Sequence, residues 1–262
     1  MEVRYFDNSA TTRIKEAVLT EMFPFLSREY GNPSSLYSIG RKSKRAIEEA
    51  RKRGFCPKKD EIKWLFFDVG STLVDESKVY EDRMKRIADL SGLTYEQINK
   101  YAMSFYKENK KGDLEVARQL DVKLPKWESQ YERLYTDTKD CLKKLSRIYK
   151  IGVIANQSLG TSERLENLGV RKYLDLIIAS AEEGVSKPDR RIFEIALERS
   201  RCRPENAVMI GDRIDNDIVP AKQLGMKTIW VKQGFGSLWN ITDESEKADI
   251  EINNLSDILK YL

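Results

Sequence analysis

Two acidic residues stand directly after apolar stretches that are typical of buried β-strands. Asp68 follows residues 64–67, and Asp212 follows residues 208–210 and a glycine. Carboxylates from neighbouring strand ends can together hold Mg²⁺, a hard ion that takes oxygen ligands and keeps several waters. The alternative is that the acidic turn at 212–217 only caps the next helix, as Asp and Asn often do. That turn holds more polar residues than a cap needs, so the pattern favours a metal site.

A third candidate is Lys187, which follows a later apolar stretch and precedes the expected start of a helix. A carboxylate that attacks a phosphate dianion meets like-charge repulsion, and a fixed cation beside both groups would relieve it. Most single lysines are only solvated surface residues, but this one follows a strand, as Asp68 and Asp212 do. The hydroxyls of Ser71 and Thr72, next to Asp68, are expected to bind substrate.

The residue types that are missing exclude several kinds of site. The sequence has no histidine, which rules out Ser-His-Asp and Cys-His nucleophile systems and every histidine-bound metal site. The three cysteines, Cys56, Cys141 and Cys202, are far apart and odd in number, so neither a disulfide framework nor a zinc site is expected. Carboxylates, lysine, hydroxyls and a hard metal ion must then carry the chemistry, and a reducing, cytoplasmic location fits best.

The excess positive charge is confined to the first fifth of the chain. Residues 1–53 contain 11 lysines and arginines against 7 acidic residues, whereas the remainder contains 35 of each. The remainder has no excess positive charge of the kind that binds nucleic acid, so no nucleic-acid partner is expected. No run of about 18 apolar residues is present and the start of the sequence does not look like a signal peptide, so no membrane segment is expected.

The elements that must position these residues are short apolar runs, rich in β-formers, that alternate with helical patterns after residue 60. Such alternation predicts an α/β fold with a parallel sheet. Between the runs, Thr161 is expected to cap one helix and Pro188 to open another. The predicted strands are residues 62–67, 151–155, 176–179, 207–210, 228–231 and 250–252.

One interruption of this alternation is about 70 residues long and separates the first two strands. Residues 76–143 show helical periodicity with many aromatic side chains, and they are too many for a simple crossover. We expect a helical cap domain inserted over the carboxyl ends of the strands, where ligands bind in open α/β sheets. The predicted core is then residues 60–75 and 144–262.

Four segments resemble, in the same order, the motifs of the haloacid dehalogenase superfamily. The resemblance spans residues 62–262 and implies a Rossmann-like core with an inserted helical cap. It also implies a phosphatase that acts through an aspartyl-phosphate on a small phosphorylated molecule. The segments are Asp68-x-Gly-Ser-Thr, Ala155-Asn156-Gln157-Ser158, Lys187-Pro188 and Gly211-Asp212-x-x-x-Asn216-Asp217.

The same resemblance assigns roles to individual residues. Asp68 would be the nucleophile, and Lys187 would steady the nucleophile and the phosphate. Asn156 would offer its amide to the phosphate. Magnesium would be held by the carboxylates of Asp68 and Asp212 and the backbone carbonyl of Gly70, with support from Asp217, so the resemblance implies a metal-binding enzyme.

Two positions depart from the pattern of the superfamily's phosphatases. Most of them carry a second aspartate, the general acid and base, two residues after the nucleophile, where this chain has Gly70. The hydroxyl residue that usually opens the second motif is Ala155. These departures favour slow or narrowly directed activity and keep open a catalytically idle binding or scaffold module. A dehalogenase is disfavoured, because the acidic pair of the last motif belongs to a metal site.

The first 53 residues resemble another family, the cysteine desulfurases, which use pyridoxal phosphate. The likeness lies in residues 5–12, Tyr-Phe-Asp-Asn-Ser-Ala-Thr-Thr, and residues 30–35, Tyr-Gly-Asn-Pro-Ser-Ser. The lysine, histidine, aspartate and cysteine that this family needs come from later parts of its fold. No pyridoxal phosphate is therefore expected, and the segment is interpreted as a helical appendage left by fusion. A dimerisation arm that gives a homodimer is the alternative.

Overall fold

The computed structural model describes residues 23–24 and 62–262. The chain divides into two compact units, Met1–Cys56 and Pro57–Leu262, and the second contains nearly all of the described residues. The predicted appendage and its dimer contact lie outside the described residues, except that residues 23–24 are helical.

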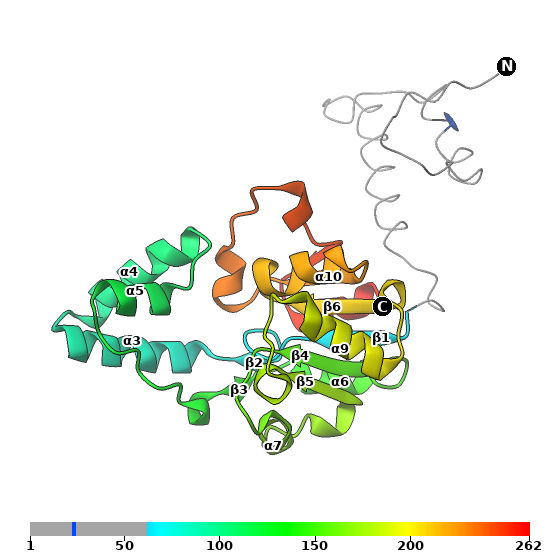
Figure 1. Ribbon diagram of the computed structural model, residues 1–262, viewed down its shortest axis with the longest axis horizontal. Helices are drawn as coiled ribbons and strands as arrows, with labels where there is room; N and C mark the ends of the chain where they lie inside the picture. Colours follow the sequence, from blue (N-terminus) through cyan, green and yellow to red (C-terminus); the bar gives the residue numbers. More distant parts are fainter. Residues whose placement is uncertain (1–22, 25–61) are drawn as a thin grey trace. The chain divides into compact units, whose positions relative to one another are not determined.

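A six-stranded parallel sheet forms the centre of the second unit (Figure 1). The strand order is β5-β4-β1-β6-β7-β8, which places the first strand of the unit in the middle. The prediction of an α/β fold with six parallel strands is confirmed. The strands are β1 (Trp64–Phe67), β4 (Lys150–Ala155), β5 (Leu176–Ala179), β6 (Ala207–Gly211), β7 (Lys227–Val231) and β8 (Ile250–Ile252).

Nearly all residues of β1, β4 and β6 are buried, as expected for parallel strands that are covered on both faces. On one face, Phe66, Ile154 and Met209 pack against Phe193 of α9 (Arg190–Ser200) and Ala221 of α10 (Val219–Gln223). Helices α9 and α10 therefore cover one face of the sheet. Helix α6 (Thr138–Leu145) contacts the C-terminal turn η7 (Leu255–Lys260): the Cys141 thiol donates a hydrogen bond to the Leu255 carbonyl.

The remaining elements are short. Among the described residues, no helix is long and apolar enough to cross a membrane. The α-helices not yet given are α7 (Thr161–Asn167) and α8 (Ser180–Glu183). The short helical turns are η1 (Ser129–Tyr131), η2 (Arg171–Tyr173), η3 (Pro204–Asn206), η4 (Ile214–Ile218), η5 (Gly234–Leu238) and η6 (Glu244–Glu246).

Three helices, α3 (Ser77–Ser91), α4 (Tyr95–Lys107) and α5 (Gly112–Gln119), form a separate group at one side of the sheet (Figure 1). Their buried residues, such as Ile87, Ile98 and Phe105, make a hydrophobic cluster of their own. A capping box opens α4, since Thr94 and Gln97 each bind the other's backbone N–H. We refer to α3, α4 and α5 as the cap helices.

The cap helices are joined to the core by a two-stranded antiparallel piece, β2 (Val74–Asp75) and β3 (Arg133–Leu134). A second contact comes from the core turn η5, whose Phe235 ring stacks on Tyr106 of α4 with centroids 4.0 Å apart. The Phe235 ring also meets Tyr80 of α3 edge-on at 4.9 Å. The cap therefore sits against the loops that follow β1 and β7.

Candidate active site

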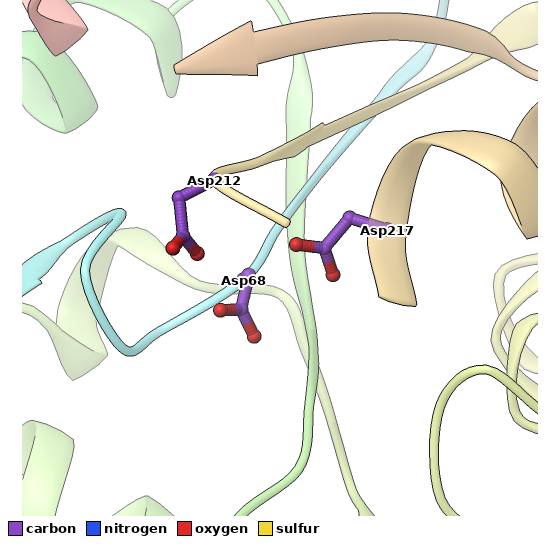
Figure 2. A group of neighbouring side chains, drawn as sticks. All are labelled: Asp68, Asp212 and Asp217. Carbon is purple, nitrogen blue, oxygen red and sulfur yellow. The ribbon is translucent and has the colours of Figure 1, made fainter. Parts of the chain in front are cut away.

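Three buried aspartates meet at the carboxyl ends of the central strands (Figure 2). Asp68 follows β1, Asp212 follows β6 and Asp217 lies in η4, and one carboxylate oxygen of each lies within 4.8 Å of those of the others. Strands β1 and β6 are parallel neighbours, and the Asp68 N–H donates to the Ile210 carbonyl at 2.8 Å. Adjacent strand ends thus bring together acidic residues that are 144 positions apart in the sequence.

Lys187 reaches this cluster from the loop between α8 and α9. Its ammonium donates to Asp68 at 2.6 Å and to Asp217 at 2.5 Å, and its side chain is only 2% exposed. Burial alone would lower the pKa of Lys187, but the charges of Asp217 and Asp68 outweigh burial and raise that pKa. The lysine is therefore a fixed cation beside the carboxylate of Asp68.

The cluster holds more negative than positive charge. Burial, and then the charges of Asp68 and Asp217, raise the pKa of Asp212. Burial also raises the pKa of Asp217, although Lys187 opposes that shift. Three buried carboxylates facing one ammonium make an all-oxygen donor set with unneutralised charge, and such a set fits a hard divalent cation such as Mg²⁺.

Two residues hold Asp217 in place. Its second carboxylate oxygen accepts a hydrogen bond from the Arg213 N–H at 3.0 Å. Gly211 leaves the necessary room, because a Cβ there would lie 2.3 Å from the same oxygen. Both oxygens of Asp217 are thus bonded to protein groups, whereas within residues 62–262 the Asp212 carboxylate accepts only a long 3.4 Å bond from the Thr72 hydroxyl.

Asn156, which follows β4, forms hydrogen bonds with the backbone of Lys187 in the loop between α8 and α9. Its amide nitrogen donates to the Lys187 carbonyl at 2.8 Å, and its amide oxygen accepts from the Lys187 N–H at 2.7 Å. In this arrangement the side chain fixes the backbone of Lys187 while also lining the cavity beside Asp68. Its predicted contact with a phosphate stays a prediction.

The hydroxyls after the nucleophile candidate point to carboxylates. Thr72 is fully buried and bonds to Asp212, while the Ser71 hydroxyl donates to Glu76 at 3.3 Å. Ser71 has a φ of 54° in a tight turn that its N–H closes by bonding to the Val74 carbonyl at 2.8 Å. This left-handed conformation is uncommon for a residue with a side chain and often marks a functional turn.

Glu76 is a site residue that the sequence analysis did not single out. Its side chain is buried, and both of its carboxylate oxygens crowd Gly70: a Cβ on Gly70 would lie 2.5 and 2.7 Å from them. Burial, and then the charges of Asp68 and Glu132, raise the pKa of Glu76 to about 8.

A cavity of 390 Å³ opens between these residues and the cap helices. Its cap side includes Tyr80, Arg83 and Trp127, and Arg164 of α7 contributes from the core. Arg83 pairs with Asp113 at 2.8 Å and stacks over the Trp127 ring. The sequence did carry a signal for this wall, since residues 76, 80 and 83 are spaced to share one face of a helix.

Comparison with protein families gives two matches in different parts of the chain. The family described as haloacid dehalogenase-like hydrolase matches residues 65–231. The family described as aminotransferase class-V matches residues 4–54. The cysteine desulfurase IscS of Methanosarcina thermophila is 42% identical over 71 residues, which are 27% of this chain and 18% of that protein.

Relatives that span the hydrolase part are named as phosphatases. The glyceraldehyde 3-phosphate phosphatase of Pyrococcus furiosus is 31% identical over 77% of this chain and 93% of its own length. That of Pyrococcus abyssi is 34% identical over 77% of this chain and 94% of its own.

Solved structures share the fold at lower identity. A phosphatase from Thermococcus onnurineus superposes with a TM-score of 0.55 at 22% identity and covers 76% of this chain and 97% of its own. A predicted phosphoglycolate phosphatase from Haemophilus somnus gives a TM-score of 0.59 at 17% identity, with coverage of 76% and 97%. These likenesses agree with the α/β fold of this chain.

Proposed function

The chain belongs to the haloacid dehalogenase-like hydrolases, and from that premise we propose a Mg²⁺-dependent phosphatase that acts through an aspartyl-phosphate on a small phosphorylated metabolite. The observation that carries this proposal is the Lys187 ammonium, which bonds to Asp68 at 2.6 Å beside the buried carboxylate of Asp212. That arrangement supplies a nucleophile, a cation for the phosphate and oxygen ligands for a metal.

In the proposed reaction, a carboxylate oxygen of Asp68 attacks the phosphorus of the ester. The new bond gives an aspartyl-phosphate, and the bond to the leaving oxygen breaks with its electron pair on that oxygen. Lys187 offsets the repulsion between the Asp68 carboxylate and the phosphate, because its charge is held beside the attacking group. Water then attacks the phosphorus, which releases phosphate and restores Asp68.

Mg²⁺ would be held by the carboxylates of Asp68 and Asp212 and the carbonyl of Gly70, with Asp217 in support. When bound, the ion would neutralise phosphate charge and act as a Lewis acid. The unneutralised acidic cluster supports this assignment.

The size of the cavity supports a small substrate. Its 390 Å³ lies at the low end of the range of roughly 300 to 1,000 Å³ for small-molecule sites. Arg83 and Arg164 both line the cavity. The Nε of Arg83 has no hydrogen-bond partner within the described part of the chain, whereas the Nε of Arg164 lies 3.4 Å from a carboxylate oxygen of Glu132. They could bind oxygens of the substrate away from the phosphate, and the names of the relatives favour a triose phosphate such as glyceraldehyde 3-phosphate.

The test is phosphate release by the full-length protein from glyceraldehyde 3-phosphate, phosphoserine, 2-phosphoglycolate and p-nitrophenyl phosphate with Mg²⁺. We expect turnover that EDTA removes and that Asp68→Asn lowers by at least about 10³-fold, as for the loss of a nucleophile. Asp89→Asn, an exposed change on α3, is the control. Absence of phosphate release from every ester would contradict the proposal, and halide release from a 2-haloacid would point to a dehalogenase instead.

A further inference from the structure

We propose that Glu76 is the proton-transfer residue of this active site, and this inference rests on the phosphatase function proposed above. The carboxyl group would give its proton to the leaving oxygen when the ester is cleaved. It would later take a proton from the water that cleaves the aspartyl-phosphate. Glu76 would thus do the work of a side chain that Gly70 cannot provide.

The position of Glu76 supports this role. Its carboxyl oxygens occupy the space where a side chain on residue 70 would begin, 2.5 and 2.7 Å from an ideal Cβ. It lines the same cavity as Asp68 and Lys187, so the proton it carries would face the substrate's ester. Ser71 donates to one oxygen at 3.3 Å and so orients the group.

The other acidic side chains of the cavity are engaged elsewhere. Asp68, Asp212 and Asp217 form the buried cluster that faces Lys187. Asp113 accepts hydrogen bonds from Arg83 and from the Tyr106 hydroxyl. Among the described residues that line the cavity, Glu76 is the carboxyl that belongs neither to the acidic cluster nor to an ion pair.

The backbone of Glu76 ties the group to the cap. Glu76 immediately precedes α3, and its carbonyl accepts hydrogen bonds from the Val79 and Tyr80 N–H groups at 2.9 and 3.0 Å. The carboxyl is therefore carried by the first turn of the cap helices, while the nucleophile is carried by β1. Correct placement of the cap would then bring the proton donor to the ester.

The proposed proton transfers accompany two displacements at phosphorus. The bond from the Asp68 oxygen to phosphorus forms, the bond from phosphorus to the leaving oxygen breaks, and that oxygen takes the proton of Glu76, which becomes a carboxylate. Water then attacks phosphorus and gives a proton to Glu76, and the electron pair of the phosphorus–oxygen bond returns to Asp68. Both residues end in their starting forms, and an alcohol and phosphate are released.

The first test is Glu76→Gln, which keeps the shape and removes the transferable proton. General acid–base catalysis contributes about 10²- to 10⁴-fold, so kcat/KM for alkyl phosphates should fall by about that factor. The kcat/KM for aryl phosphates should fall much less, because their leaving oxygens are stable as anions. A plot of log kcat/KM against leaving-group pKa should therefore become steeper. Because the second step also lacks its base, aryl esters should give a burst of product.

Glu183→Gln is the matched control, because the Glu183 side chain is only 10% exposed and pairs with Arg199 but does not line the cavity. This control should change kcat/KM for alkyl esters and for aryl esters by the same factor. A melting curve for each variant separates a folding defect from a catalytic one, and the ratio of the two esters is independent of the amount of folded protein.

A second test places a carboxyl on residue 70 instead of residue 76. In the double variant Gly70→Asp, Glu76→Ala, the new carboxyl can enter the space that Glu76 vacates, and alkyl phosphate turnover should recover relative to Glu76→Ala. Gly70→Asp alone should not raise it, because Glu76 already fills that space.

An unchanged alkyl-to-aryl ratio in Glu76→Gln would overturn this inference while leaving the phosphatase function intact, since the unmodified protein would still release phosphate. An unmodified protein that cleaves no phosphate ester would overturn both.

Discussion

At the active site, three buried carboxylates and one buried ammonium lie together beside the cavity. Lys187 bonds to Asp68 and Asp217 but not to Asp212. Carboxylates held together in this way repel each other and are costly to bury when charged. Asp212 is consequently the member whose charge is least compensated without a metal.

We therefore predict that Asp212→Asn stabilises the metal-free protein and removes its stabilisation by Mg²⁺. The pKa of Asp212 is raised in the fold above its usual 3.8, so the folded protein binds this proton more tightly than the unfolded chain. That contribution to stability is present at acidic pH and is lost as the pH rises, and asparagine avoids the loss. The melting temperature should exceed that of the unmodified protein by about 2 to 4 °C per kcal/mol gained.

Differential scanning calorimetry with EDTA and with Mg²⁺, between pH 4 and 8, checks this prediction. The difference between the two metal-free proteins should grow toward neutral pH. Asp215→Asn is the control, because Asp215 lies in the same turn but pairs with Arg213. If Mg²⁺ raised the melting temperature of Asp212→Asn as much as that of the unmodified protein, this carboxylate would not be a ligand of the metal.

At the scale of elements, the sequence was sufficient for the sheet and for a helix face shared by residues 76, 80 and 83, but not for the way that face packs against the strand ends. The six strands could be predicted because parallel strands, buried on both faces, are nearly continuous apolar runs. Their order then brings Asp68 and Asp212 together without further information. The contact of Glu76 with Gly70 depends instead on how the cap folds back over the strand ends, and no local pattern records that.

Smaller features near helix starts were predicted less well. The expected cap at Thr161 is wrong: Gly160 occupies the N-cap position, and the Thr161 hydroxyl donates to the Ser158 carbonyl. Pro188 does not open α9, which begins at Arg190 after an N-cap at Asp189. Several polar residues in a row could each have served as a cap, and only the backbone conformation decides between them.

The cap–core contact at η5 gives a prediction of its own. Phe235→Ala removes the ring that meets Tyr80 and Tyr106, so the cap should be held less firmly over the cavity. Because closure excludes water and completes the site, we expect kcat to fall and KM to rise together. Steady-state kinetics with glyceraldehyde 3-phosphate measure both.

The matched control for this prediction is Phe105→Ala, which removes a buried ring from the interior of the cap helices. Phe105→Ala should destabilise the protein by about 3 to 5 kcal/mol, as buried Phe-to-Ala changes do, and Phe235→Ala should destabilise it less, because that ring is only partly buried. Only Phe235→Ala should alter both kinetic constants strongly, and equal kinetics in the two variants would exclude a role for the η5 contact in closure.

At the scale of the whole molecule, two unrelated families meet in one chain. The aminotransferase match ends at residue 54 and the hydrolase match begins at residue 65. Every residue proposed for the phosphatase reaction lies at or beyond Asp68, within the unit Pro57–Leu262. The first segment covers only a small part of a desulfurase, and 18% of the Methanosarcina thermophila enzyme is matched.

We predict that deleting residues 1–53 leaves kcat/KM for phosphate esters within about twofold of the full-length value, because every residue proposed for the reaction comes later in the sequence and sites that share no partners contribute independently. The full-length protein should also develop no yellow absorbance with pyridoxal phosphate, since that cofactor depends on residues from later parts of the desulfurase fold. Light scattering of both forms tests the alternative of a dimerisation arm: a dimer that becomes a monomer on deletion would support it. Loss of phosphatase activity in a deleted protein that still melts cooperatively would show that the segment takes part in catalysis, and it would then have to be regarded as part of the enzyme rather than as a remnant of fusion.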